Sequence, residues 1–100
     1  MTTSKRATIQ WMPTDQGGRN RPPVGPQYMA PARFAAAAAS WPQEAWTLVA
    51  DIIGSPDESG NWQAQVHFLM ENAPHHLIVD GAEFEYYEGR RRVACGRIVG

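Results

Sequence analysis

Apolar and polar residues alternate at every second position in several short segments of this chain, and stretches rich in glycine and proline separate these segments. In residues 5–12, for example, Ala7, Ile9 and Trp11 fall on one face. Successive side chains of a strand point to opposite faces, so a period of two is typical of a half-buried β-strand. No segment shows a convincing helical period. The pattern therefore predicts an all-β fold, either a barrel or a sandwich.

The same alternation predicts further strands over residues 45–53 and 62–70, and a shorter strand over residues 75–79. Residues 82–99 predict two strands that are joined by a tight turn at Gly89. With the first segment, this makes five or six short strands. We expect the first and last of them to lie side by side and to close a ring of sheet.

Two stretches interrupt the alternation. Residues 13–31 contain three glycines and five prolines, which resist a regular ladder of hydrogen bonds, and they are predicted to form a loop. Residues 33–46 contain a run of five alanines, which favour a helix. Pro42 limits that helix, however, and a helix this short is marginal alone. We expect strand or irregular structure there, with a helix as the alternative.

Charge is distributed unevenly, although the net charge is only −1. Residues 1–34 carry five basic residues against one acid, residues 35–88 carry nine acids without a lysine or arginine, and residues 89–100 carry four arginines. If the terminal strands are neighbours, one face of the protein is positive. The alternative is that the basic ends neutralise the acidic middle.

The predicted hairpin over residues 82–99 is itself divided by charge. Its first strand carries Glu83, Glu85 and Glu88, and its second begins with Arg90, Arg91 and Arg92. Carboxylates and guanidinium groups on neighbouring strands can pair across the hairpin. Each exposed pair contributes only about 0.2–1 kcal/mol, so the pairs help to set register more than stability.

Length and composition indicate a single domain over residues 1–100. Cys95 is the sole cysteine, so an internal disulfide is excluded. No apolar run approaches the ~18 residues of a membrane span, and the N-terminal residues lack the apolar core of a signal peptide. We therefore expect a cytoplasmic protein that does not bind a membrane.

The histidines, the cysteine and the paired glutamates could in principle catalyse a reaction or bind a metal, but their positions in the sequence favour structural roles. His75 and His76 are adjacent, so on a strand they would point to opposite faces, and the histidines lack the spacing of a zinc site. Cys95 in a strand is expected to be a buried, inert thiol, with a nucleophile as the alternative. Glu83 and Glu85 are expected on a solvated face. We therefore predict no catalysis, no metal and no cofactor.

Two longer stretches carry a pattern that extends over nearly the whole chain, DQGGRNRPPVGPQYMAPARF at residues 15–34 and PHHLIVDGAEFEYYEGRRRVACGRIVG at residues 74–100. In order and rough spacing they resemble the start and the end of the third, C-terminal domain of the elongation factor Tu family. The matching positions are Gly17, Gly18, Arg19, Pro22, Tyr28, Pro31 and Phe34, then Pro74, Asp80, Gly81, Phe84, Glu88, Gly89, Val93, Gly96 and Ile98.

The resemblance implies a single six-stranded antiparallel Greek-key β-barrel. It implies that Gly96 lets the last strand bend or approach a neighbour closely, and that Tyr28 and Phe34 pack a loop against the barrel. The chain also departs from the family. It has no G-x-x-x-x-G-K-[ST] motif, so we expect no bound nucleotide. Met29 stands where the family usually has a basic residue, which puts the family's tRNA contact in doubt.

A basic and aromatic set is the candidate binding site, because arginine binds phosphate through two hydrogen bonds and tyrosine can stack on a base. Its members are Arg19, Arg21, Tyr28, Arg33, Gly89, Arg90, Arg91 and Arg92. The alternative is solvated charge, with Tyr28 as a packing residue. The set predicts a non-enzymatic module that binds a protein or a tRNA-like RNA, and not DNA. Two further hypotheses are a regulatory, protein-binding barrel unrelated to translation and a small enzyme around Cys95 or a histidine.

Overall fold

A computed structural model describes residues 4–11, 26–40 and 45–100. The described chain contains six strands and two short 3₁₀ helices, which confirms the all-β prediction. The strands are β1 (Lys5–Trp11), β2 (Gln27–Phe34), β3 (Trp46–Ile53), β4 (Asn61–Phe68), β5 (Glu83–Glu88) and β6 (Arg91–Ile98). The 3₁₀ helices are η2 (Ala35–Ser40) and η3 (His75–Leu77).

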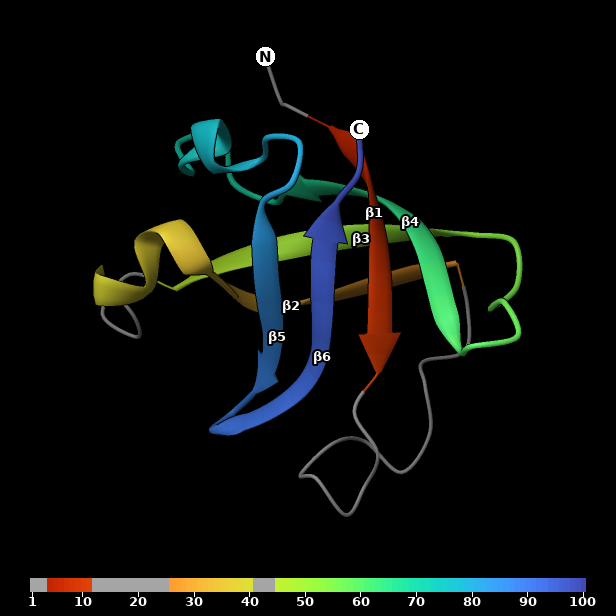
Figure 1. The fold of residues 1–100 in the computed structure, drawn as a ribbon. Helices are drawn as coiled ribbons and strands as arrows, with labels where there is room; N and C mark the ends of the chain where they lie inside the picture. The colour runs from red at the N-terminus through yellow and green to blue at the C-terminus, as the bar shows by residue number, and fades with distance from the viewer. Residues whose placement is uncertain (1–3, 12–25, 41–44) are drawn as a thin grey trace.

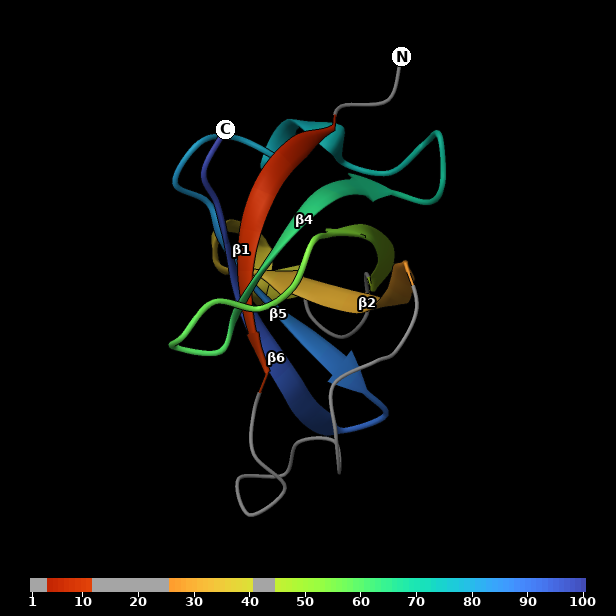
Figure 2. The same cartoon turned by 90° about the vertical axis from the view of Figure 1, so that its right-hand side faces the viewer.

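The six strands close into one antiparallel barrel in the order β1-β4-β3-β2-β5-β6. Strand β1 lies between β4 and β6, as Figures 1 and 2 show. In the pairing of the first and last strands, Ala7 lies opposite Ile98, and the Val99 amide donates to the Arg6 carbonyl at 2.9 Å. The expected closure of the barrel by its outermost strands is therefore confirmed.

The connections follow a Greek-key path. Strands β2, β3 and β4 are consecutive neighbours, and β5 returns to pair with β2, the first of the three. In an antiparallel barrel, alternate strands begin at opposite ends. One end carries the 3₁₀ helices η2 and η3, and the other carries the β5–β6 turn at Gly89, where φ is 65°.

Aromatic rings fill the barrel interior, because the alternation turns every second side chain inward. Near the β5–β6 turn, Trp11, Tyr28 and Tyr86 are in contact, with ring centroids 4.8–6.4 Å apart. Near η2 and η3, the Phe34 ring lies 5.5 Å from Phe68 and 5.3 Å from Phe84. A contact of 5.6 Å between Phe84 and Tyr86 joins the two groups into one core.

The close approach expected at Gly96 is present. A β-carbon at this position would lie 2.6 Å from Cε2 of Phe84, which is directly opposite on β5. The space that a side chain would need is therefore filled by the Phe84 ring, which is itself almost completely buried.

The loop predicted over residues 13–31 is wrong for its last part, because β2 begins at Gln27. Tyr28 and Ala30 point inward from this strand, and Met29 points outward, so the period of two is present beneath the prolines. Tyr28 and Phe34 consequently pack inside the barrel as strand residues, not as loop residues on its surface. Residues 13–25 lie outside the described part of the chain.

The strand predicted over residues 75–79 is also wrong. Residues His75–Leu77 form η3, in which the Leu77 amide donates to the Pro74 carbonyl at 3.0 Å. The apolar run is explained by burial of Ile78 from a turn and not by a ladder. The alanine run forms the 3₁₀ helix η2 with a kink at Ala37. The expected strand or irregular structure is therefore wrong for Ala35–Ser40, and the helical alternative is nearer to what forms there.

Candidate functional site

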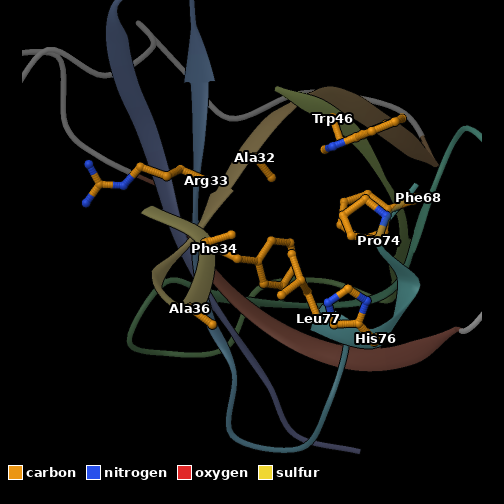
Figure 3. A pocket seen from close by; sticks show the side chains of 10 residues that line it. Ala32, Arg33, Phe34, Ala36, Trp46, Phe68, Pro74, His76 and Leu77 are labelled. Atoms are coloured by element: carbon orange, nitrogen blue, oxygen red, sulfur yellow. The ribbon is translucent and has the colours of Figure 1, made fainter. Parts of the chain in front are cut away.

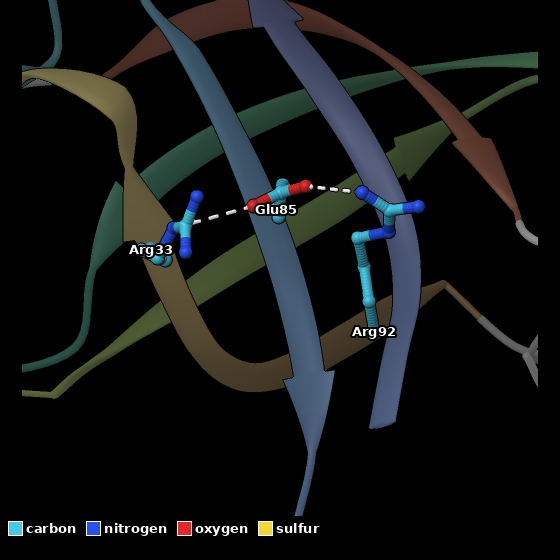
Figure 4. A network of polar contacts seen from close by, with 3 residues as sticks. All are labelled: Arg33, Glu85 and Arg92. Atoms are coloured by element: carbon cyan, nitrogen blue, oxygen red, sulfur yellow. Dashed lines mark hydrogen bonds and ion pairs between the residues drawn. The ribbon is translucent and has the colours of Figure 1, made fainter. Parts of the chain in front are cut away.

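An ion-pair network crosses the outer surface of three neighbouring strands (Figure 4). Arg92 of β6 donates from Nη1 to Oε2 of Glu85 at 2.8 Å. Arg33 of β2 lies on the other side, with its Nε 3.3 Å from Oε1 of the same carboxylate. Glu85 faces outward because its neighbours Phe84 and Tyr86 turn inward. One carboxylate thus holds two guanidinium groups, which leaves one positive charge in the network.

The β5–β6 turn adds further positive charge beside this network. Arg90 and Arg91 are exposed next to Gly89, whose left-handed backbone forms the turn. No ion pair joins either arginine to an acid within the described residues. The neighbouring Glu88 accepts a hydrogen bond of 2.6 Å from the Tyr28 hydroxyl. The turn therefore presents guanidinium groups to solvent on a strand pair that is anchored to the core.

Part of the predicted hairpin pairing is confirmed. The pair between Glu85 and Arg92 forms, and Glu88 lies opposite Arg91 in the register. Glu83 instead lies opposite Arg97, so its prediction as a partner of residues 90–92 is wrong. A bulge between Tyr86 and Tyr87 shifts the register in the middle of the hairpin, which the local pattern did not indicate.

The structure brings some of the predicted site residues together and places others elsewhere. Arg33, Gly89, Arg90, Arg91 and Arg92 gather on the β2, β5 and β6 side of the barrel. Residue Tyr28 is only 7% exposed, which favours the packing role over stacking on a partner. Arg19 and Arg21 lie outside the described residues. The ion pair of Arg33 with Glu85 was missed, because no local pattern predicts which distant strand pairs with β2.

Cys95 lies on the outer face of β6, opposite Glu85, and is partly buried. Burial raises the pKa of its thiol, and the nearby carboxylates of Glu85 and Glu83 raise the pKa further. Arg92 acts in the opposite direction and lowers this pKa, but burial is the largest influence and the net shift is upward. The thiol form is therefore favoured over the reactive thiolate.

We expect native Cys95 to react with iodoacetamide at neutral pH more slowly than the same residue in the chain unfolded by urea. Arg92→Ala should slow the reaction further, because it removes the charge that favours the thiolate, and Glu85→Gln should accelerate it. Mass spectrometry of timed samples measures both rates. A native thiol that reacts faster than the unfolded one would restore the nucleophile hypothesis.

Other chemistry has little support in the described part of the chain. His75 and His76 lie in η3 and not on a strand, so the argument from opposite faces does not apply to them. No group of three or more His, Cys, Asp or Glu side chains in residues 4–11, 26–40 and 45–100 is arranged to hold a metal ion. Within those ranges, no helix has the length and hydropathy that crossing a bilayer requires.

The fold and this surface together define a small closed β-barrel with a cluster of arginines around one hairpin. Comparisons with protein-family models, with curated proteins and with solved structures find no match for the chain. The resemblance to the third domain of elongation factor Tu therefore stays a prediction from the sequence motifs.

Proposed function

We propose that the protein is a non-enzymatic binding module, similar to the third domain of elongation factor Tu, that contacts an RNA phosphate backbone through its β5–β6 hairpin. The observation that carries this proposal is the exposure of Arg90 and Arg91 at the turn, with no acid of the described chain paired to either. Exposed guanidinium groups bind phosphate oxygens through two parallel hydrogen bonds.

The hairpin is held in place for such a contact. The hydrogen bond from Tyr28 to Glu88 ties the end of β5 to β2, and the Tyr86 hydroxyl donates to the Leu48 carbonyl of β3 at 3.0 Å. A guanidinium group on an ordered strand pair loses less conformational freedom on binding than one on a mobile loop. The rigid support therefore favours a binding role for the hairpin arginines.

Glu85 modulates the same surface. It neutralises part of the charge of Arg33 and Arg92, and these side chains are still 38% and 45% exposed. A phosphate that approaches the turn would therefore meet Arg90 and Arg91 first. It would then compete with Glu85 for Arg33 and Arg92. This arrangement predicts moderate affinity with a strong dependence on salt.

The double substitution R90A/R91A is expected to weaken binding to tRNA and to poly-uridine RNA. The slope of log affinity against log salt concentration should also become shallower by about 1.4, because two phosphate contacts are lost and each contributes about 0.7 on a single strand. Glu85→Gln should act in the opposite direction, because it releases Arg33 and Arg92 from their carboxylate. Fluorescence anisotropy over a series of salt concentrations measures both effects.

The matched control is Arg97→Ala, which removes an exposed arginine from the same strand but near the other end of the barrel. It should leave the affinity nearly unchanged. Equal losses in R97A and in R90A/R91A would mean that net charge, and not the hairpin, governs binding. If no RNA binds at low salt, the RNA proposal is wrong.

A second candidate function, a protein-interaction barrel, is favoured by exposed apolar side chains. Leu69, Met70, Val79 and Val99 are each about half exposed and lie in or beside the segments that cross the η3 end of the barrel. These aliphatic and methionine side chains would supply the apolar part of a protein interface. An absence of RNA binding, together with hairpin-independent capture of a protein, would favour this candidate.

A further inference from the structure

A cavity of about 280 Å³ opens at the barrel end that carries η2 and η3, away from the β5–β6 turn (Figure 3). Its walls include Phe34, Trp46, Phe68, His76 and Leu77. We propose that this cavity binds an uncharged, planar aromatic small molecule of the size of indole. The site goes beyond the proposed RNA contact and does not depend on it.

The aromatic walls follow from the strand order. Phe34 ends β2, Trp46 begins β3 and Phe68 ends β4, and these three strands are neighbours that reach the same barrel end. The Phe34 and Phe68 rings are 5.5 Å apart and tilted by 48°. Because both residues are almost completely buried, only a small part of each ring forms the cavity wall, which the partly buried Trp46 and Leu77 complete. A planar ring gains most from such walls, because aromatic pairs favour offset or edge-to-face contact.

The opposite wall is fixed before any ligand arrives. His75 binds the Glu71 carbonyl through Nε2 at 2.7 Å, and its ring meets Phe68 edge-on at 5.9 Å. These contacts hold η3 so that the next two residues, His76 and Leu77, line the cavity. A pre-formed wall reduces the free-energy cost of ordering the protein when a ligand binds, so even a small ligand can bind there.

The polar groups at the cavity indicate an uncharged ligand. Arg33 contributes to the lining, but Figure 3 shows its guanidinium group directed away from the rings, towards the side where Glu85 pairs with it. His76 and the indole of Trp46 are the other polar groups among the described lining residues. They can serve one hydrogen-bonding group of the ligand, whereas a charge on the ligand would meet no carboxylate or guanidinium group of the described lining residues directed into the cavity.

The volume and the closure of the barrel favour a small molecule over a peptide. An apolar protein cavity of about 150 Å³ accepts a benzene ring, so one of about 280 Å³ suits a ligand of two fused rings. A peptide that docks by strand addition needs an open sheet edge, and this barrel is closed by its first and last strands. An aromatic side chain of a partner protein is the competing occupant, and the test separates the two.

The test is an NMR titration of the ¹⁵N-labelled full chain with indole. We expect saturable binding with a Kd on the order of 1 mM. The chemical-shift changes should concentrate on Phe34, Phe68 and Leu77 and spare the β5–β6 turn.

Ala37→Leu, which places a larger side chain in the cavity wall, should weaken indole binding by about tenfold. Ala35→Leu is the matched control, because Ala35 lies on a different surface depression.

A second variant guards against local rearrangement around Ala37. Leu77→Ala enlarges the cavity and should shift the preference from indole towards the larger 2-naphthol. Absence of saturable indole binding, or equal binding in A37L and A35L, would overturn the proposal. N-acetyltryptophanamide provides the other decisive comparison. If it binds about tenfold more tightly than indole, the site takes a partner's side chain and the small-molecule assignment is wrong.

Discussion

Gly96→Ala is expected to destabilise the barrel by about 1–3 kcal/mol, although alanine is normally the better residue within a strand. The added methyl group would lie 2.6 Å from Cε2 and 2.7 Å from Cε1 of Phe84. That ring cannot move aside easily, because it packs against Phe34 at 5.3 Å and Tyr86 at 5.6 Å and is only 2% exposed. Urea denaturation monitored by circular dichroism measures the loss.

The double variant G96A/F84L tests whether the ring is the cause. Phe84→Leu alone should destabilise the protein, because it leaves a cavity. In a chain that already carries Phe84→Leu, however, the added methyl group at residue 96 should cost little. The coupling free energy between the two substitutions should therefore be at least about 1 kcal/mol, within the range of about 0.5–3 kcal/mol for residues in contact. Additive losses would mean that backbone strain in β6, and not the Phe84 ring, restricts residue 96.

Local patterns were sufficient to predict the two strands and the turn of the C-terminal hairpin, although not the bulge within it. The alternation around Phe84 and Tyr86 places both side chains in the core, and Gly89 supplies the left-handed residue of the turn. A hairpin is predictable because its partners are adjacent in sequence, so periodicity and turn chemistry indicate the same structure. The pair between Glu85 and Arg92 followed from the same reasoning.

Tertiary pairing explains the elements that the sequence pattern missed. Pro31 made β2 resemble a loop, yet it lies opposite Thr47 of β3, and the pairing of β2 with β5 begins only at the next residue, Ala32. A strand can accept proline where the ladder lacks a bond on that side. The segment at residues 75–79 shows the opposite error, since a short apolar run is equally compatible with a buried turn.

The candidate sites follow the same division. The arginines of the hairpin were visible in the sequence, because they are consecutive and flank a recognisable turn. The aromatic cavity was not, because Phe34, Trp46 and Phe68 come from three strands and converge only through the strand order. Burial of Tyr28 likewise depends on β2 being a strand, which the prolines obscured.

The folded protein is expected to lose stability steeply above pH 10, and Tyr86 is the expected cause. Its side chain is fully buried and its hydroxyl donates to the Leu48 carbonyl at 3.0 Å. Burial, followed by the nearby Tyr28 and Asp51, raises the pKa of this phenol far above its ordinary value of 10.0. Between the unfolded and the folded pKa the unfolded chain binds fewer protons, so each pH unit in that range lowers the free energy of unfolding by about 1.4 kcal/mol.

Tyr86→Phe separates this titration from general alkaline damage. At pH 7 the variant should be less stable by about 1 kcal/mol, because it loses a buried hydrogen bond. Above pH 10 its stability should fall less steeply than that of the parent chain, so the two curves converge and then cross. Urea denaturation at a series of pH values from 7 to 12 measures the stability curves of both proteins. Because phenylalanine has no proton to lose, parallel curves for Y86F and the parent would show that the buried phenol does not control alkaline unfolding.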